Sequence, residues 1–172
     1  MNLGADDFQV FGLPRRFAID RAELDARRRA LQAEVHPDRF ASADAAARRA
    51  AMQWAVRVNE AYRRLKDPLA RAAYLCELRG APIDAENNTA MPSDFLAQQM
   101  HWRESLDEAA ATPAIEALAR EVASEREARL RRVGQLLDEH GDAAGAAREV
   151  RALMFIERFA EDVERRMETL GQ

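Results

Sequence analysis

The chain has 172 residues, of which 33% are charged and 48% apolar, and this composition is typical of an all-α protein with one domain or two small ones. Its net charge of −4 gives no overall attraction to nucleic acid or to an anionic membrane. No apolar stretch approaches the ~20 residues of a membrane span, and the N-terminus lacks the regions of a secretory signal. We therefore expect a cytoplasmic protein. The single cysteine, Cys76, excludes an internal disulfide and a cysteine-cluster metal site.

Three helices are predicted in the first part of the chain. A short one lies within residues 7–14 and is stopped by Gly12 and Pro14. A second covers residues 21–35, because Asp20 and Glu23 have the spacing of a capping box. A third ends before residue 68, and apolar residues at steps of three and four give it one continuous stripe. The residues of that stripe are Ala47, Ala51, Trp54, Val58, Ala61, Tyr62 and Leu65.

The tripeptide His36-Pro37-Asp38 lies between the second and third predicted helices. Pro37 has no N–H and biases His36 out of the α region, so one continuous helix is excluded and the tripeptide lies on a loop. At the tip of a helical hairpin these side chains face water and contribute little to a core. Loop residues on a rigid scaffold commonly serve recognition, which is the role we predict here.

The second half of the chain predicts a separate helical bundle. One more helix covers residues 69–78, and Gly80 closes it. Turn-forming residues follow, so we place an N-terminal domain at residues 1–79, a linker at 80–92 and a second domain at 93–172. Three helices with short connections, separated near Pro113 and Gly141, favour an antiparallel three-helix bundle.

Some large apolar residues of this bundle do not fit its core stripes. On the first bundle helix, Leu96 and Met100 lie roughly 100–140° around the helix from the core residue Phe95. On the last helix, Phe155 lies about 100° from the centre of the apolar cluster. Two interpretations stay open. These residues either pack against another part of the protein or form an exposed patch for a protein partner.

Catalytic and metal chemistry have little support in the sequence. His36 and Asp38 could form an acid–base pair, but a loop tip offers no concave site that excludes water. The histidines His36, His101 and His140 lack the spacing of metal ligands. No Gly-rich phosphate loop or nucleophile motif is present. We therefore expect no catalytic site, no metal and no cofactor; a metal-dependent enzyme is a distant alternative.

The arginines of the second predicted helix do not indicate nucleic-acid binding. They are interleaved with Asp25 and Glu34, and no aromatic platform accompanies them. The simplest interpretation is a solvated helix face. Next to an exposed Asp38, the same arginines could instead dock on an acidic protein surface.

The His-Pro-Asp loop between a basic and an alanine-rich helix resembles a J-domain, the module that docks on Hsp70-class chaperones and stimulates their ATPase. Over nearly its whole length the sequence also resembles the HscB (Hsc20) family. The matching segments are Phe11-Gly12-Leu13-Pro14, the run from His36 to Ser42, Asn59-Glu60-Ala61-Tyr62, Leu65, Pro68-Leu69-Ala70-Arg71-Ala72, Tyr74-Leu75, Asp94-Phe95-Leu96 and Arg103-Glu104. The resemblance implies an L-shaped protein with an N-terminal J-domain and a C-terminal three-helix bundle.

The resemblance also implies two partners. The bundle would bind an IscU-type iron–sulfur scaffold protein, and the J-domain would deliver this client to an HscA-type Hsp70 chaperone. The implied chaperone-binding residues are His36, Pro37, Asp38 and Arg39, with Arg27, Arg28 and Arg29 adding electrostatic steering. The implied scaffold-binding residues are Leu96, Ala97, Met100, His101, Arg103, Glu104 and Phe155.

Three residues depart from the family pattern. Ala97 and His101 stand where the family often has a larger apolar residue and an acid, and Arg28 replaces the usual aromatic and would have to lay its stem along the hairpin. A J-domain adaptor for another client is one alternative function, and a purely structural helical protein is a second. We expect a monomer or weak self-association.

Overall fold

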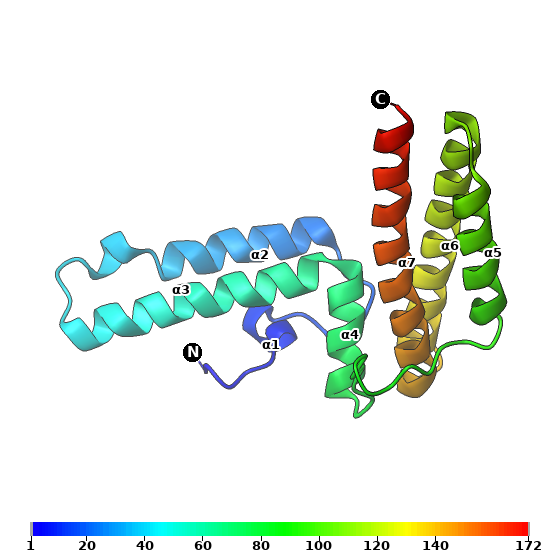
Figure 1. The fold of residues 1–172 in the computed structure, drawn as a ribbon. Coiled ribbons are helices and arrows are strands. Elements are labelled where there is room, and N and C mark those ends of the chain that lie inside the picture. The colour runs from blue at the N-terminus through cyan, green and yellow to red at the C-terminus, as the bar shows by residue number, and fades with distance from the viewer. Residues whose placement is uncertain (1, 172) are drawn as a thin grey trace. The chain divides into compact units, whose positions relative to one another are not determined.

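The computed structural model describes residues 2–171 and confirms the all-α prediction (Figure 1). Over these residues the chain forms seven α-helices and one short 3₁₀-helix, η1. The helices are α1 (Asp7–Phe11), α2 (Arg21–Glu34), η1 (Pro37–Phe40), α3 (Ala45–Lys66), α4 (Pro68–Leu78), α5 (Phe95–Glu108), α6 (Thr112–Asp138) and α7 (Ala143–Leu170). Two compact units result, the first ending at Tyr74 and the second beginning at Leu75.

The first unit is built around the hairpin of α2 and α3, which lie side by side with η1 in the connection between them (Figure 1). Asp20 caps α2 by accepting hydrogen bonds from the N–H groups of Ala22 and Glu23. The side chain of Glu23 pairs with Arg27 one turn along the helix, at 2.6 Å, so it takes up an (i, i+4) ion pair. The reciprocal capping box is found instead at α1, between Asp6 and Gln9.

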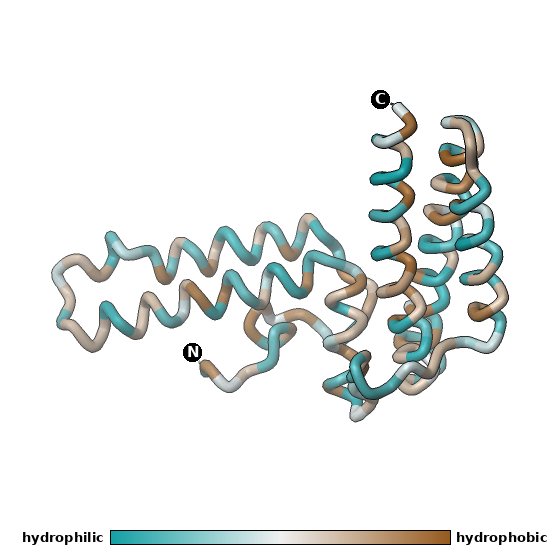
Figure 2. The backbone as a smooth tube through the Cα atoms, viewed as in Figure 1, coloured by the Kyte–Doolittle hydropathy of each residue, from teal (hydrophilic) through white to brown (hydrophobic). Residues whose placement is uncertain are grey.

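The core of the first unit follows the predicted stripe of α3. Both hairpin helices alternate between hydrophobic and hydrophilic residues along their length (Figure 2). The buried members of the stripe are Ala51, Val58, Ala61, Tyr62 and Leu65. A buried carboxylate fixes α1 on α3, because Asp7 forms ion pairs with Arg57 at 2.7 Å and with Arg64 at 3.1 Å.

The second unit contains the helices α5, α6 and α7, which lie side by side as a bundle (Figure 1). An aromatic cluster fills the space between α5 and α7. The Trp102 and Phe159 rings stack with centroids 5.5 Å apart, and Phe95 meets Trp102 edge-on at 6.1 Å. This cluster joins the shorter α5 to the long pair of α6 and α7.

The boundary between the two units differs from the predicted one. The division falls inside α4, and residues 80–92 belong to the second unit. Arg151 of α7 is buried and donates to the carbonyl oxygens of Pro82, Ile83 and Ala90, at 3.3, 2.9 and 3.0 Å. The turn-forming residues indicated a linker, but the buried arginine satisfies their backbone carbonyls and fixes the segment on the bundle.

Within the described part of the chain, every helix is too short or too polar to cross a membrane.

Two candidate protein-binding surfaces

The His-Pro-Asp loop is held by short-range backbone geometry and is open to solvent. His36 has extended backbone angles, φ −60° and ψ 134°, and Pro37 begins η1 immediately after it. Nδ1 of His36 accepts the N–H of Asp38 at 3.2 Å, while the N–H of Arg39 bonds to the carbonyl of His36 at 3.0 Å. The Asp38 side chain is 93% exposed. The loop therefore presents an exposed carboxylate on a fixed turn, with one carboxylate oxygen 3.6 Å from Nδ1 of His36.

Arg27 has a side chain that is 42% exposed and makes contacts within the first unit, while its steering role stays a prediction. Its guanidinium donates to the carbonyl oxygens of Phe11 and Gly12, at 2.8 and 3.0 Å, and also pairs with Glu23. Gly12 ends α1 with φ +64°, and a Cβ on it would lie 2.8 Å from the Arg27 guanidinium. Arg27 thus binds the carbonyl end of α1 and holds that helix on α2.

Arg28 lies over the ring of Tyr62, with its guanidinium carbon 4.0 Å from the ring centroid. This cation–π contact gives the side chain an aromatic support that its stem alone would lack. The Tyr62 hydroxyl donates to Asp25 at 2.7 Å and accepts from Arg21 at 2.9 Å. The hydrogen bond from Tyr62, followed by that from Arg21, lowers the pKa of Asp25 below its ordinary value. Arg29 is exposed on the same helix.

An apolar groove lies beside the loop, and the sequence analysis missed it. Its volume is about 320 Å³, and Arg48 lies on its wall. Met52 and Val56 of α3 are 65% and 57% exposed, values that are high for large apolar side chains on a monomer. The other lining residues are Val35, Pro37, Phe40, Ala51 and Ala55. The available signal was that Met52 and Val56 fall off the buried stripe of α3.

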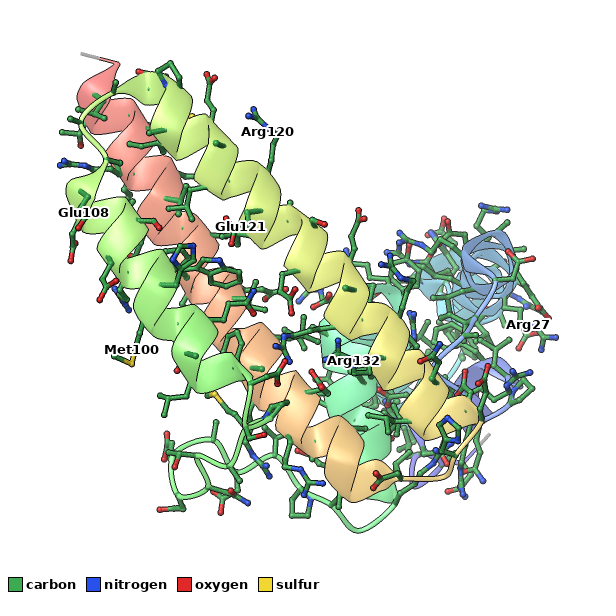
Figure 3. All side chains as sticks on the ribbon, turned by 90° about the vertical axis from the view of Figure 1, so that its right-hand side faces the viewer. Arg27, Met100, Glu108, Arg120, Glu121 and Arg132 are labelled. Carbon is green, nitrogen blue, oxygen red and sulfur yellow. The ribbon has the colours of Figure 1, made fainter. Side chains whose placement is uncertain are left out.

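The second surface is an exposed apolar patch on α5 and α7. Leu96 and Met100 are 65% and 59% exposed, and Met100 points away from the bundle (Figure 3). Phe155 of α7 is half-buried, and its ring meets Phe95 edge-on at 5.6 Å. Of the two open interpretations, exposure of Leu96 and Met100 favours a partner-binding patch over packing inside the protein.

The structure brings most of the predicted scaffold-binding residues to one place. A hollow of about 390 Å³ is lined by Gln99, Met100, Arg103, Glu104 and Phe155. The guanidinium of Arg103 lies 5.6 Å from the centroids of both Phe155 and Phe159. The patch therefore has an apolar floor with one cation and one carboxylate on its rim.

Ala97 and His101 lie exposed on the same helix. Nε2 of His101 is 3.9 Å from a carboxylate oxygen of Glu121, which also accepts the indole N–H of Trp102 at 2.9 Å. His101 therefore stands toward α6, outside the lining of the hollow.

The titratable groups of residues 2–171 form no cluster of three or more that could hold a metal ion. Cys76 is buried, and this burial raises the pKa of its thiol to about 11. The thiol is therefore protonated at neutral pH and is a weak nucleophile.

The chain has the features of a J-domain co-chaperone. Its helical hairpin presents an exposed His-Pro-Asp loop, and its bundle carries an exposed apolar patch.

The HSCB C-terminal oligomerisation domain family matches residues 91–164. A co-chaperone protein HscB homolog of Burkholderia multivorans is 56% identical over 99% of this chain and 98% of its own. Chaperone HscB from Vibrio cholerae has a TM-score of 0.79 at 34% identity, covering 96% of this chain and 99% of that one. Human co-chaperone protein HscB has a TM-score of 0.86 at 26% identity, covering 95% and 83%. The chain belongs to the HscB family of co-chaperones.

Proposed function

We propose that this co-chaperone binds an IscU-type iron–sulfur scaffold protein through the patch on α5 and α7 and delivers it to an HscA-type Hsp70 chaperone in the cytoplasm. The His-Pro-Asp loop then stimulates the chaperone's ATPase, which assists iron–sulfur cluster assembly and transfer. The observation that carries the proposal is the exposure of Leu96 and Met100 beside Phe155, in a chain whose first unit carries an exposed His-Pro-Asp loop.

The chaperone side of the proposal depends on charge. Asp38 is an acceptor-only carboxylate in water and suits an arginine of the partner. Pro37 fixes the turn that presents it. The exposed arginines Arg29 and Arg39, with Arg28 on its tyrosine support, would attract an acidic surface and raise the association rate.

The apolar groove extends this chaperone-binding surface. Pro37 belongs both to the loop and to the wall of the groove, so a protein that covers the loop would also reach Met52 and Val56. Burying these two side chains would add an apolar contribution to a contact that is otherwise polar.

The scaffold side of the proposal depends on apolar contact. Large apolar side chains at the centre of an interface carry most of its binding free energy, and polar residues at the rim fix the orientation. Leu96, Met100 and Phe155 supply such a centre, and Arg103 and Glu104 supply the rim. Ala97 gives this chain a smaller apolar surface at one edge of the patch.

One chain that carries both surfaces would act by effective concentration. Once the scaffold is bound to the bundle and the chaperone to the loop, the chaperone meets its client within one complex. ATP hydrolysis then takes place on the chaperone, and the co-chaperone regulates its rate without a catalytic group of its own.

The test is steady-state ATP hydrolysis by an HscA-type chaperone with this protein, an IscU-type scaffold, or both. We expect synergistic stimulation when both are present. Stimulation that is independent of the scaffold would favour a second candidate, a J-domain adaptor for another client, which the departures at Ala97 and His101 keep open. Absence of any stimulation would contradict the J-domain role itself.

Self-association also stays a prediction. The matched family is described as an oligomerisation domain, and we propose that this chain is a monomer or associates weakly. Sedimentation equilibrium over a hundredfold concentration range would decide between these states.

A further inference from the structure

We infer that Arg129 of α6 positions the N-terminal turn of α5, and with it the apolar residues Leu96 and Met100. Arg129 is fully buried, which is rare for an arginine, yet it contacts no predicted binding residue directly. It would act through the orientation of α5. The inference rests on the scaffold-binding role proposed for α5 and names a residue on which that role depends.

The guanidinium of Arg129 joins three helices. On α6 itself Nε lies 2.8 Å from Glu125, and on α7 one terminal nitrogen lies 2.8 Å from the buried Glu149. The other terminal nitrogen reaches Asp94 and Gln98 at the start of α5, both at 3.4 Å. The two long helices thus hold a cation whose remaining donors point at α5.

An aromatic contact links this cation to the patch. The Arg129 guanidinium carbon lies 4.6 Å from the centroid of the Phe95 ring, and Phe95 in turn meets Phe155 edge-on at 5.6 Å. Phe95 therefore lies between the buried cation and the half-buried ring of the patch. Because Leu96 follows Phe95 in the chain, a change in the orientation of Phe95 would also move the exposed leucine.

The N-terminal turn of α5 has few local restraints of its own. Asp94 occupies the N-cap position but makes no side-chain capping hydrogen bond, and its carboxylate reaches Arg129 instead. Removing one partner of a buried ion pair is strongly destabilising where the other charge stays buried and unpaired. Here Glu149 keeps Arg132 as a partner and the Asp94 side chain is 66% exposed, so we assign to Arg129 an effect on the placement of α5 that is larger than its effect on the stability of the bundle.

The chain offers a clean variant and a matched control. Arg129→Met keeps the apolar stem and leaves Glu149 paired, because Arg132 also contacts that carboxylate, at 3.1 Å. Arg132→Met removes the other arginine of Glu149, and the ion pair that it breaks joins α6 to α7. Arg132 lies on the same helix, α6 (Figure 3). The two variants therefore remove the same charge from one network.

The experiment measures amide hydrogen exchange in the full chain and binding of an IscU-type scaffold. For Arg129→Met we expect exchange at residues 95–100 to accelerate by about tenfold or more, with α6 and α7 unchanged, and scaffold affinity to fall by about tenfold, which corresponds to about 1.4 kcal/mol. Arg132→Met should leave both quantities near those of the wild type. Equal effects of the two variants, or no effect of Arg129→Met on α5, would overturn the inference.

A double-mutant cycle separates positioning from general destabilisation. If Arg129 acts by placing Leu96, the affinity lost through Arg129→Met should be smaller when Leu96→Ala is already present. Strict additivity of the two losses in affinity would contradict positioning.

If Arg129→Met does not fold, a second variant tests the same contacts. Asp94→Ala combined with Gln98→Ala removes the hydrogen bonds from Arg129 to α5 and keeps its buried ion pair with Glu149. A wild-type chain that does not bind the scaffold would contradict the proposed function, while hydrogen exchange would still judge the placement of α5.

Discussion

The His-Pro-Asp loop and the apolar patch are supported in opposite ways. The loop is fixed by hydrogen bonds among residues 36–39, and the side chains of His36 and Asp38 are 58% and 93% exposed. The patch joins α5 to α7, which are far apart in sequence, and it stands on an aromatic cluster with a buried arginine behind it. A local turn is enough to present a charged side chain to solvent. An apolar patch needs a folded core beneath it, because the core keeps side chains from two helices side by side on the surface.

This difference predicts two kinds of binding. Charged groups in water act at a distance and mainly raise the association rate, and salt screens them. Apolar side chains act on contact and mainly slow dissociation. We expect the chaperone contact to be brief and the scaffold contact to be longer-lived. That order suits a protein that must hold its client until a second partner arrives.

The largest expected effect is at the loop. His36→Gln should abolish stimulation of an HscA-type chaperone, because a flexible amide replaces the imidazole that fixes the turn. Scaffold affinity and helical content should stay at wild-type values, since the His36 side chain is 58% exposed. ATPase rates, titration calorimetry and circular dichroism measure the three quantities. A loss of helical content would show that His36 is structural.

The second effect is at the patch. Leu96→Ala combined with Phe155→Ala should weaken scaffold binding by about 2–4 kcal/mol if both are hot spots, while scaffold-free stimulation of the chaperone is retained. Leu78→Ala is the matched control, because Leu78 is also an exposed leucine, 40% accessible, but lies on α4. Equal affinities for the double variant and the control would remove the patch from the proposal.

The third effect is at the apolar groove beside the loop, and it tests whether the chaperone contact also includes apolar side chains. Val56→Glu should raise the concentration for half-maximal chaperone stimulation by about tenfold, since a buried valine contributes about 1.5 kcal/mol or more. Gln53→Glu adds the same charge to an exposed position of α3 outside the groove. If both variants behave alike, charge alone explains the effect and the groove has no role.

The smallest effect is at Tyr62, whose ring lies against Arg28 and whose hydroxyl binds Asp25. Tyr62→Phe removes the hydroxyl that donates to Asp25, so the lowered pKa of Asp25 should move back toward its ordinary value near 3.8. A carboxyl whose pKa is lower in the folded state than in the unfolded state stabilises the fold when the pH is above its unfolded-state pKa. This stabilisation is lost as the pH falls through its folded-state pKa. The variant should therefore lose less stability on acidification. Carboxyl NMR titration of Asp25 measures the shift, and an unchanged titration would show that Arg21 alone sets it.

Much of this arrangement could be predicted from the sequence, where the deciding interactions are local. Helical periodicity located the hairpin and the bundle, and the wheel positions of Leu96, Met100 and Phe155 predicted an apolar face outside the core. The proline placed the tripeptide on a loop. These features depend on spacing within one helix or one turn, which a sequence displays directly.

Other features depend on long-range contacts and could not be predicted. The role of Arg27 follows from its position over the end of α1, which only the folded unit defines. The turn-rich segment became part of the second unit because Arg151, which lies 61 and 68 residues after Ala90 and Ile83, binds their carbonyls. Arg129 looks like any other arginine of a charged helix, and its complete burial follows from the approach of α5 and α7. In each case a long cationic side chain finds acceptors far away in sequence.

The hydrogen bond inside the loop fixes the tautomer of His36. Because Nδ1 accepts the N–H of Asp38, the proton of the neutral imidazole resides on Nε2. One ring nitrogen therefore completes the turn, and the other is left as a hydrogen-bond donor. The exposed loop then offers a donor on His36 next to an acceptor on Asp38. A chaperone surface that recognises both must supply the reverse pattern, an acceptor beside a cationic donor, and a partner that carries positive charge alone would engage half of the site.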